Sequence, residues 1–545
     1  MKRNYATHTA IVGGGIAGIT SAIELLDANK KVVLLDRDLE KNFGGLAKES
    51  FGGMFFINSP QQRFSGIKDS IAQAKKDWYS FAEFDENEVW GKKWADAYLE
   101  STQKIYDWVR SKKVGFFPVV HWVERGLFAP GNSVPRFHMV WGTGDGLIKA
   151  LLDHLKSHPH NKNLTLYFGH KVTGFEFKDS EIVALSGVDE ASGEFFECRA
   201  ENFIIATGGI NGNIQKVRKN WHEEWSDPPE VLLNGSHHFS DGLIHDEVTQ
   251  IGGSVTNLDL MWNYAAGIPH PYPKRENHGL SLVPPKSALW VNYKGERMGP
   301  VPLVTSFDTR YLVTKICEQE KQFSWQILNK KIAYKELGVS GSEFNEGIKN
   351  KKLFSFLYSI LKGNKHLIKI LERDSPNYIT AQSVGELAKK MNRLTGTNDV
   401  DEAILQRTID DYDENFKRGK NIWNDEQIRR IEHTRAYKGD RKRTLKPQKL
   451  NQKRAYPLIA IREFILSRKS LGGIQTNLHS QVLKSTSKNN TPQVFENLYA
   501  VGEAAGFGGG GSHGKRALEG TFLTSCIFTA LKAAQHITEK NNNEK

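Results

Sequence analysis

Short apolar runs, separated by glycines and by a helical pattern, characterise the first part of the chain. Residues 9–12 form an apolar, strand-like run that the glycines of 13–18 interrupt. Residues 19–26 then repeat apolar side chains on one helical face, and a second apolar run, 32–35, ends at Asp36. This order predicts a βαβ unit, whose parallel strands are covered by helices on both faces.

The same style returns in the middle of the chain, as a second βαβ-like piece, and again at its C-terminus. The further elements that we expect are a helix at 146–158, strands at 164–168, 172–177, 182–188, 202–206 and 497–501, and a terminal helix at 521–536. Residues 261–454 instead carry Pro-rich and aromatic segments, followed by amphipathic helices rich in Lys and Glu. The pattern predicts an α/β protein. A Rossmann-like domain with a parallel sheet is built from 1–258 and 455–545, and an α+β cap (substrate) domain, 259–454, is inserted into it.

Length and composition bound the class of protein. A chain of 545 residues is longer than one compact core usually serves, which agrees with two domains. Because no apolar run reaches 18 residues and none precedes the first strand, we expect neither a transmembrane helix nor a secretory signal. The three cysteines, Cys198, Cys317 and Cys526, are far apart, which fits neither a disulfide framework nor a zinc site and favours a cytoplasmic location.

The net charge of +12 raises the question of an anionic partner. Much of the positive charge lies between Arg429 and Arg454, with Arg441, Lys442 and Arg443 adjacent. This run is either a solvated surface loop or a docking patch for an acidic partner or substrate. No helix-turn-helix, zinc-finger or aromatic-platform motif accompanies it, so we expect no nucleic acid partner.

The first glycine turn has the spacing of a dinucleotide fingerprint. Gly13, Gly15 and Gly18 form GxGxxG between a strand and a helix, and Asp36 follows Gly18 by 18 residues at the end of the next strand. Gly13 permits the tight turn, Gly15 lets the backbone approach a pyrophosphate, and Gly18 allows close packing of helix on strand. The Asp36 carboxylate can accept hydrogen bonds from the adenosine ribose. The fingerprint alone does not separate FAD from NAD.

Later segments do separate the two cofactors. Gly52-Gly53, the strand end at 206–209 and the glycine-rich loop after Glu503 resemble the fumarate reductase/3-ketosteroid dehydrogenase superfamily of flavoproteins. Within it the chain is most similar to a bacterial branch of FAD-binding dehydrogenases, some of which are described as ketosteroid-dehydrogenase-like. The stretches that carry this resemblance are 51–55, 131–138, 141–144, 470–473 and 502–523.

The resemblance implies which residues bind FAD. They are Gly13, Gly15, Ala17, Gly18, Asp36, Arg37, Gly44, Gly45, Ala206, Gly208, Glu503 and Leu523. Glu503 would bind a ribityl or ribose hydroxyl. The glycine-rich loop and the helix near Leu523 would lie under the isoalloxazine, where a helix N-terminus stabilises an anionic reduced flavin.

The resemblance also bears on attachment and on electron transfer. Relatives with covalent flavin carry a histidine six residues before the glycine pair at 52–53. Leu46 occupies that position, so we expect non-covalent FAD. The segment 141–146 lacks the acidic residue that a second dinucleotide site requires. We therefore expect an external electron acceptor or donor, such as a quinone, oxygen or another protein.

The catalytic candidates follow from departures from the relatives. Fumarate reductases carry a histidine and, shortly after it, an arginine that holds a substrate carboxylate. His513 matches the histidine, which can donate a proton or polarise a carbonyl, but Ala517 takes the arginine position. Arg516 lies one residue earlier, and Lys469 stands where a second histidine is found in the relatives.

The ketosteroid branch uses tyrosines, one as a phenolate that takes a proton and another that polarises the ketone. Tyr264, at the start of the predicted cap, is one candidate, and Tyr311 and Tyr437 are weaker ones. A packing role in a core or an interface also explains each of them.

These inferences predict an FAD-dependent oxidoreductase acting on C–C bonds adjacent to a carbonyl, ketosteroid-dehydrogenase-like. A small, hydrophobic substrate would lie between the cap and the flavin, which exchanges the hydride at N5. Two alternatives stay open. The first is a fumarate-reductase-like ene-reductase of an unsaturated acid, which Arg516 and Lys469 favour. The second is a basic FAD protein that binds RNA or an acidic partner, which the run 429–454 favours.

Overall fold

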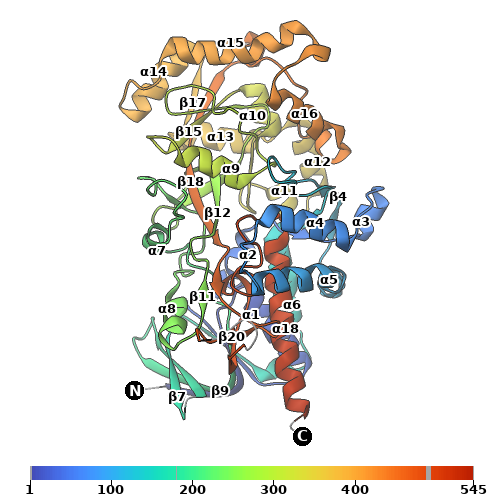
Figure 1. The fold of residues 1–545 in the computed structure, drawn as a ribbon, viewed down its shortest axis with the longest axis vertical. Coiled ribbons are helices and arrows are strands. Elements are labelled where there is room, and N and C mark those ends of the chain that lie inside the picture. Colours follow the sequence, from blue (N-terminus) through green and yellow to red (C-terminus); the bar gives the residue numbers. More distant parts are fainter. Residues whose placement is uncertain (1–2, 180, 487–491, 544–545) are drawn as a thin grey trace. The chain divides into compact units, whose positions relative to one another are not determined.

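The computed structural model describes residues 3–179, 181–486 and 492–543 (Figure 1). The chain divides into two compact units. Unit 1 holds Met1–His222, Ser236–Trp262 and Lys469–Lys545, and unit 2 holds Glu223–Gly235 and Asn263–Arg468. Unit 2 contains most of the segment expected as a cap. It also takes in 455–468, because the long strand β18 (Leu458–Ser470) pairs with β15 and β17 of that unit. The role of unit 2 as a cap stays a prediction.

A largely parallel sheet forms the centre of unit 1. Its main strands run in the order β20, β21, β9, β1, β2, β6. Their bounds are β1 (Arg3–Val12), β2 (Val32–Asp36), β6 (Leu164–Phe168), β9 (Phe195–Ile205), β20 (Gln481–Leu483) and β21 (Val494–Ala500). β1 pairs in parallel with β2 and β9, β2 with β6, and β21 with β9. The predicted α/β class with a parallel sheet is confirmed.

Antiparallel strands extend this sheet. β7 (His170–Lys178) and β8 (Glu181–Asp189) form a hairpin whose second strand pairs with β9. The sequence pattern predicted both strands, but their assignment to a second βαβ-like piece is wrong. Parallel neighbours need a crossover of a dozen or more residues, whereas β8 begins three residues after β7 ends.

Helices cover the sheet of unit 1. Ten of the 12 residues of α1 (Ile16–Asp27) are buried, because this helix packs against β1, β2, α6 (Thr143–Lys156) and the terminal helix α18 (Thr521–Asn543). On the other face, Ala10, Val33 and Phe203 pack with Ile244 and Val248 of α8 (Leu243–Gln250).

Unit 1 also contains further helices and two small sheets. They are α2 (Gly45–Glu49), α3 (Pro60–Phe64), α4 (Ile71–Ala82), α5 (Trp90–Ser111), α7 (Ile214–Lys219), the sheet of β3 (Gly53–Phe55), β5 (Phe137–Val140) and β4 (Phe116–His121), and the pair β11 (Val255–Thr256) with β19 (Gly473–Ile474).

Unit 2 combines a mainly antiparallel sheet with helices, as expected for an α+β domain. The main strand order is β14 (Leu289–Val291), β15 (Phe323–Asn329), β18, β12 (Met261–Pro269), β13 (Gly279–Val283), β16 (Gly338–Val339), with β10 (Leu233–Asn234) and β17 (Tyr378–Ala381) beside β18. The helices are α9 (Thr309–Cys317), α10 (Lys330–Glu336), α11 (Glu346–Lys349), α12 (Leu353–Lys362), α13 (Lys365–Asp374), α14 (Val384–Thr395), α15 (Glu402–Arg418), α16 (Glu426–Ala436) and α17 (Lys438–Arg441).

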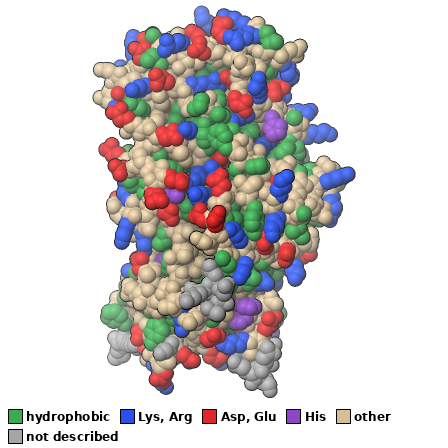
Figure 2. Space-filling view, in the orientation of Figure 1, with side chains coloured by type: hydrophobic (Ala, Val, Ile, Leu, Met, Phe, Trp, Pro, Cys, Tyr) green, Lys and Arg blue, Asp and Glu red, His purple; other side chains and the backbone are tan. Residues whose placement is uncertain are grey.

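The basic run 429–454 is not a simple surface loop. It begins inside α16, where Arg430 is buried, stacks over Phe307 at 5.0 Å and donates to the Pro302 carbonyl. Part of its charge therefore serves packing within unit 2. On the face drawn in Figure 2, Lys and Arg side chains are interleaved with Asp and Glu side chains.

Candidate functional site

The turn between β1 and α1 leaves open space at only one of its three fingerprint glycines. A Cβ atom on Gly13 would lie 2.4 Å from the Ala206 carbonyl oxygen, and one on Gly18 would lie 2.0 Å from the Gly13 carbonyl oxygen. A Cβ atom on Gly15 would meet no atom within 4 Å. Gly13 and Gly18 therefore serve close packing, whereas Gly15 faces room in which another group can approach the backbone.

The same turn provides the two polar features that a dinucleotide requires. Gly15 precedes α1 as its N-cap and provides no side-chain cap, so the first N–H groups of the helix can bind an anion at the positive end of the helix dipole. The Asp36 carboxylate lies beside this turn and accepts hydrogen bonds from the backbone N–H groups of Asp38 (3.0 Å) and Gly14, while burial raises its pKa. A pyrophosphate at the helix start and a ribose at Asp36 suit this arrangement, so the residues fit FAD.

Two glycines of the next loop lie against this turn. The Gly44 N–H donates to the Gly14 carbonyl oxygen (2.9 Å), and a Cβ atom on Gly45 would point at the Gly15 Cα, 3.6 Å away. Leu46 follows and is half-buried. The structure thus brings Gly44 and Gly45 together with Gly15, and their contact with the pyrophosphate stays a prediction.

Glu503 joins the ends of two other strands. Its Oε1 accepts the backbone N–H of Ser470 at the end of β18 (3.0 Å). A Cβ atom on Gly209, just beyond β9, would lie 2.6 Å from the same oxygen. Ala206 and Gly208, which were predicted to bind FAD, precede Gly209 on this connection. Glu503 therefore sits where β9, β18 and the glycine-rich loop converge.

Of three other predicted FAD-binding residues, one forms ion pairs within the protein and two are buried or half-buried. The Arg37 guanidinium pairs with Glu190 and with Asp241, each at 2.9 Å. These two carboxylates hold the Arg37 side chain within unit 1, and its contact with FAD stays a prediction. Ala17 is buried in α1, and Leu523 is half-buried in the first turn of α18.

His513 is fully buried in an aromatic cluster of unit 1. Its ring stacks on Trp78 with a centroid distance of 5.2 Å and an interplanar angle of 16°. Phe507 and Phe522 lie at 5.1 and 5.4 Å, and Trp78 Nε1 donates to the Ser512 carbonyl oxygen (3.0 Å). The cluster fixes both the position and the tilt of the imidazole.

The hydrogen bonds around His513 assign its tautomer. The Thr521 hydroxyl donates to the Leu518 carbonyl (2.6 Å), so the proton of the 2.8 Å contact between His513 Nε2 and Thr521 Oγ1 belongs to Nε2. Burial, assisted by the charge of Lys469, lowers the pKa of His513 to about 3, and the ring is neutral near pH 7. Nδ1 is therefore an acceptor, and it has no hydrogen-bond partner among the described residues. In this state His513 has no free N–H with which to polarise a carbonyl.

Lys469 belongs to the same cluster. Its Nζ lies 4.0 Å from the centroid of the Phe522 ring, which in turn contacts His513. Trp262 approaches Phe522 from another side (5.9 Å) and donates from Nε1 to Glu519 Oε1 (3.2 Å). A cation beside a neutral imidazole acceptor can stabilise negative charge that develops on a bound carbonyl oxygen.

Arg516 is directed to another partner. Its Nη1 lies 2.5 Å from a carboxylate oxygen of Glu83, the residue directly after α4, and the Arg516 side chain is only 13% exposed. Ala517, at the position of the arginine of the relatives, is fully buried. Arg516 thus already has a carboxylate partner within the protein.

The candidate tyrosines all lie in unit 2. Tyr264 is half-buried on β12, and Tyr437 is the residue at which α16 ends. Tyr311 donates its hydroxyl to the Val301 carbonyl oxygen (3.0 Å), and burial raises its pKa. The Tyr311 hydroxyl is thus engaged within unit 2, while catalytic roles of Tyr264 and Tyr437 stay predictions.

Comparison with known proteins identifies the family. Residues 8–523 match the family model described as FAD binding domain. The chain belongs to this family. It is 37% identical to a KsdD-like steroid dehydrogenase of Mycobacterium tuberculosis (strain CDC 1551 / Oshkosh), over 97% of this chain and 95% of the relative. A KsdD-like steroid dehydrogenase of Mycolicibacterium smegmatis is also 37% identical, over 94% of this chain and 95% of its own length.

Solved structures agree with the fold of the FAD binding domain family. The 3-ketosteroid delta1-dehydrogenase of Sterolibacterium denitrificans superposes with a TM-score of 0.70 and 14% identity, covering 98% of this chain and all of the other. A flavocytochrome c3 fumarate reductase gives a TM-score of 0.67 with 19% identity, covering 98% of this chain and 79% of the other. The family match and the 37% identity with KsdD-like steroid dehydrogenases confirm the predicted FAD-dependent oxidoreductase.

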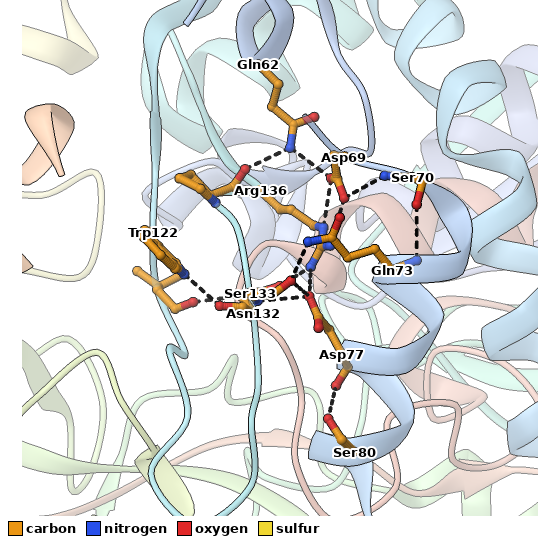
Figure 3. A network of polar contacts seen from close by, with 12 residues as sticks. Gln62, Asp69, Ser70, Gln73, Asp77, Ser80, Trp122, Asn132, Ser133 and Arg136 are labelled. Atoms are coloured by element: carbon orange, nitrogen blue, oxygen red, sulfur yellow. Dashed lines mark hydrogen bonds and ion pairs between the residues drawn. The ribbon is translucent and has the colours of Figure 1, made fainter. Parts of the chain in front are cut away.

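A buried ion-pair network supports the helix that carries Trp78 (Figure 3). The Arg136 guanidinium is fully buried and pairs with Asp69 (2.8 Å) and Asp77 (2.5 Å). Asp77 also accepts hydrogen bonds from the backbone N–H and the hydroxyl of Ser133. Because Trp78 follows Asp77 in α4, the network anchors the ring on which His513 stacks. Arg136 therefore helps to hold the Trp78 ring beside His513.

Reasoning from the sequence alone did not find the ion-pair network of Arg136. The stretch 131–138 was used only as a mark of resemblance, and neither Trp78 nor Thr521 was a candidate. Asp69 and Asp77 are separated from Arg136 by 67 and 59 residues. No local pattern in the sequence pairs residues at such distances.

Replacing Arg136 with methionine is expected to destabilise unit 1 strongly. The change leaves two buried carboxylates without their cation, which costs about 3–5 kcal/mol. Chemical denaturation followed by circular dichroism measures the loss. As a control, Lys417→Met removes an exposed ion pair with Glu414 and should change stability by less than about 1 kcal/mol. A loss for Arg136→Met no larger than that of the control contradicts the prediction.

Proposed function

We propose that this protein is an FAD-dependent dehydrogenase of 3-ketosteroids or of similarly hydrophobic ketones. It would remove two hydrogens from a C–C bond next to the ketone. The observation that carries the proposal is the 37% identity with KsdD-like steroid dehydrogenases, which extends over 97% of this chain.

The residues around His513 support this chemistry. A bound FAD would supply the acceptor for the hydride. The protein must then stabilise charge on the carbonyl oxygen and accept one proton from carbon. We assign the first task to Lys469. A pKa of about 3 makes His513 a weak base, so we assign it hydrogen-bond acceptance and leave the proton to Tyr264.

Reduction of an unsaturated acid is the second candidate. It has support from the 24% identity with a fumarate reductase of Schizosaccharomyces pombe and from the positive charge of Lys469. The ion pair of Arg516 with Glu83 and the buried Ala517 speak against a carboxylate clamp. We therefore rank dehydrogenation first.

Anaerobic flavin absorbance distinguishes the two candidates. We expect the oxidised flavin band to bleach when the protein is mixed with a panel of 3-ketosteroids. To test the opposite direction of reaction, the photoreduced protein is mixed with fumarate and with enones. Reoxidation by the unsaturated acids, with no bleaching by any ketosteroid, overturns the proposal in favour of a reductase.

We further propose that FAD is bound without a covalent bond. Leu46 stands where covalent relatives have histidine, and a leucine side chain offers no nucleophile for the flavin. Denaturation in acid followed by centrifugation should leave all flavin in the supernatant, where its absorbance is measured. Yellow colour and fluorescence that stay with the precipitated polypeptide would contradict the prediction.

A further inference from the structure

Helix α12 (Leu353–Lys362) exposes large apolar side chains in a continuous stripe. Five of them are spaced so that they lie on one face of the helix. Their exposed fractions are 48% for Leu353, 87% for Phe354, 42% for Leu357, 60% for Tyr358 and 68% for Leu361. Single exposed apolar residues are common, but a stripe of five on a short helix marks a contact surface.

All charged residues in the segment around this stripe are lysines. The segment from 347 to 371 contains no Asp or Glu, and the first acids on either side are Glu346 and Glu372. The lysines of the segment are Lys349, Lys351, Lys352, Lys362, Lys365 and Lys369. All but Lys349, which is half-buried, are exposed. This differs from the interleaved charges on the face of the molecule drawn in Figure 2.

Neighbouring segments of unit 2 add positive charge and hold the helix in place. The buried Phe356 is the inward-facing residue of α12, and the Arg443 guanidinium lies 5.7 Å from its ring. Lys335 donates to the Ile360 carbonyl oxygen, and the charges of Arg443 and Lys442 contribute, after burial, to its lowered pKa. Lys442 and Arg443, from the basic run 429–454, thus lie close to α12.

We propose that α12 and its flanking lysines dock this protein on an anionic lipid bilayer. With ten residues, α12 is too short to cross a bilayer, and none of the helices formed by the described residues is long and apolar enough to do so. A helix with an apolar stripe and lysines at both ends instead lies flat in the headgroup region. Its apolar side chains enter the acyl boundary while its lysines contact lipid phosphates. Because the segment is positively charged, we expect it to bind an anionic bilayer rather than a neutral one. The inference does not depend on the substrate.

Vesicle flotation of the FAD-loaded full-length protein tests the proposal. Vesicles of phosphatidylcholine are compared with vesicles that also contain about 30 mol % phosphatidylglycerol. We expect binding to the anionic vesicles at least about tenfold stronger than to the neutral ones, and a marked weakening at high salt. Equal binding to both kinds of vesicle, or none to either, overturns the proposal.

Two pairs of variants separate the stripe and its lysines from general surface effects. K351Q/K352Q/K362Q/K365Q is compared with K76Q/K104Q/K149Q/K162Q, which removes the same number of exposed charges from unit 1. Phe354→Ser/Leu361→Ser is compared with Phe64→Ser/Phe195→Ser, whose side chains are 90% and 70% exposed. Each α12 variant should weaken vesicle binding at least about tenfold, while its control changes it less than about twofold.

The remaining outcomes also decide the question. Control variants that lose as much binding as the α12 variants overturn the proposal, because the effect is then nonspecific. Sedimentation velocity without lipid tests whether the stripe binds a second copy of the chain instead of a bilayer. A dimer that Phe354→Ser/Leu361→Ser abolishes makes the stripe a self-association surface and likewise overturns the proposal. Retained flavin and unchanged thermal unfolding show that the variants are folded.

Discussion

Replacing Gly15 with valine is expected to abolish FAD retention in a protein that still folds. The backbone at Gly15 (φ −73°, ψ −178°) is one that valine adopts without strain, and a Cβ atom there meets no protein atom within 4 Å. The valine side chain would instead fill the space through which the pyrophosphate approaches the backbone. We expect FAD binding to weaken at least about 100-fold, equivalent to about 2.7 kcal/mol. The flavin-to-protein absorbance ratio after gel filtration, followed by FAD titration, measures the effect.

Two further glycine variants make this result specific. Gly15→Ala adds a single methyl group to the same space and should weaken FAD binding less than valine does. Gly338→Val places the same side chain in a strand of unit 2, where a Cβ atom finds its nearest neighbour at 3.7 Å, and should retain FAD fully. A Gly15→Val protein with the FAD content of the wild type would remove Gly15 from the cofactor site.

The features that the sequence predicted are those encoded locally. The strand, turn and helix around Gly15 depend on apolar periodicity and on glycines a few residues apart, so 32–35 matched β2 to within one residue. The hairpin of β7 and β8 was assigned wrongly because strand periodicity does not carry the direction of pairing. The short connection between the two strands decides it, because only antiparallel neighbours can be joined so closely.

The environment of each candidate side chain was beyond local reasoning. His513 stacks on Trp78, which is 435 residues away, and Arg516 pairs with Glu83, which is equally remote in the sequence. Composition and spacing place a histidine and an arginine on one loop, but they carry no information on which side chains of other elements meet them. The tautomer and neutrality of His513 follow only from Thr521, Leu518 and burial.

Replacing Lys469 with methionine is expected to slow flavin reduction by substrate while FAD content stays unchanged. Methionine keeps an unbranched apolar stem beside Phe522 and removes only the charge, which lies 4.0 Å from that ring. If Lys469 stabilises charge on the substrate carbonyl, its loss should lower the rate of anaerobic flavin reduction about 100-fold. The lost interaction forms mainly in the transition state, so kcat should fall more than KM rises. Stopped-flow absorbance with the ketosteroid found by the bleaching assay provides the rate.

A lysine elsewhere in unit 1 separates this role from a general effect of charge. Lys484 is also half-buried and lies over a phenylalanine ring, Phe495, at 5.3 Å, but Phe495 belongs to β21 rather than to the His513 cluster. In the Lys484→Met variant, substrate should therefore reduce the flavin at the wild-type rate. A similar slowing in both variants would point to the net charge of the unit, and unchanged kinetics in Lys469→Met would make Lys469 a bystander. Slowing in Lys469→Met alone leaves the position of the cation as the cause, because the two variants remove the same charge from the same kind of contact.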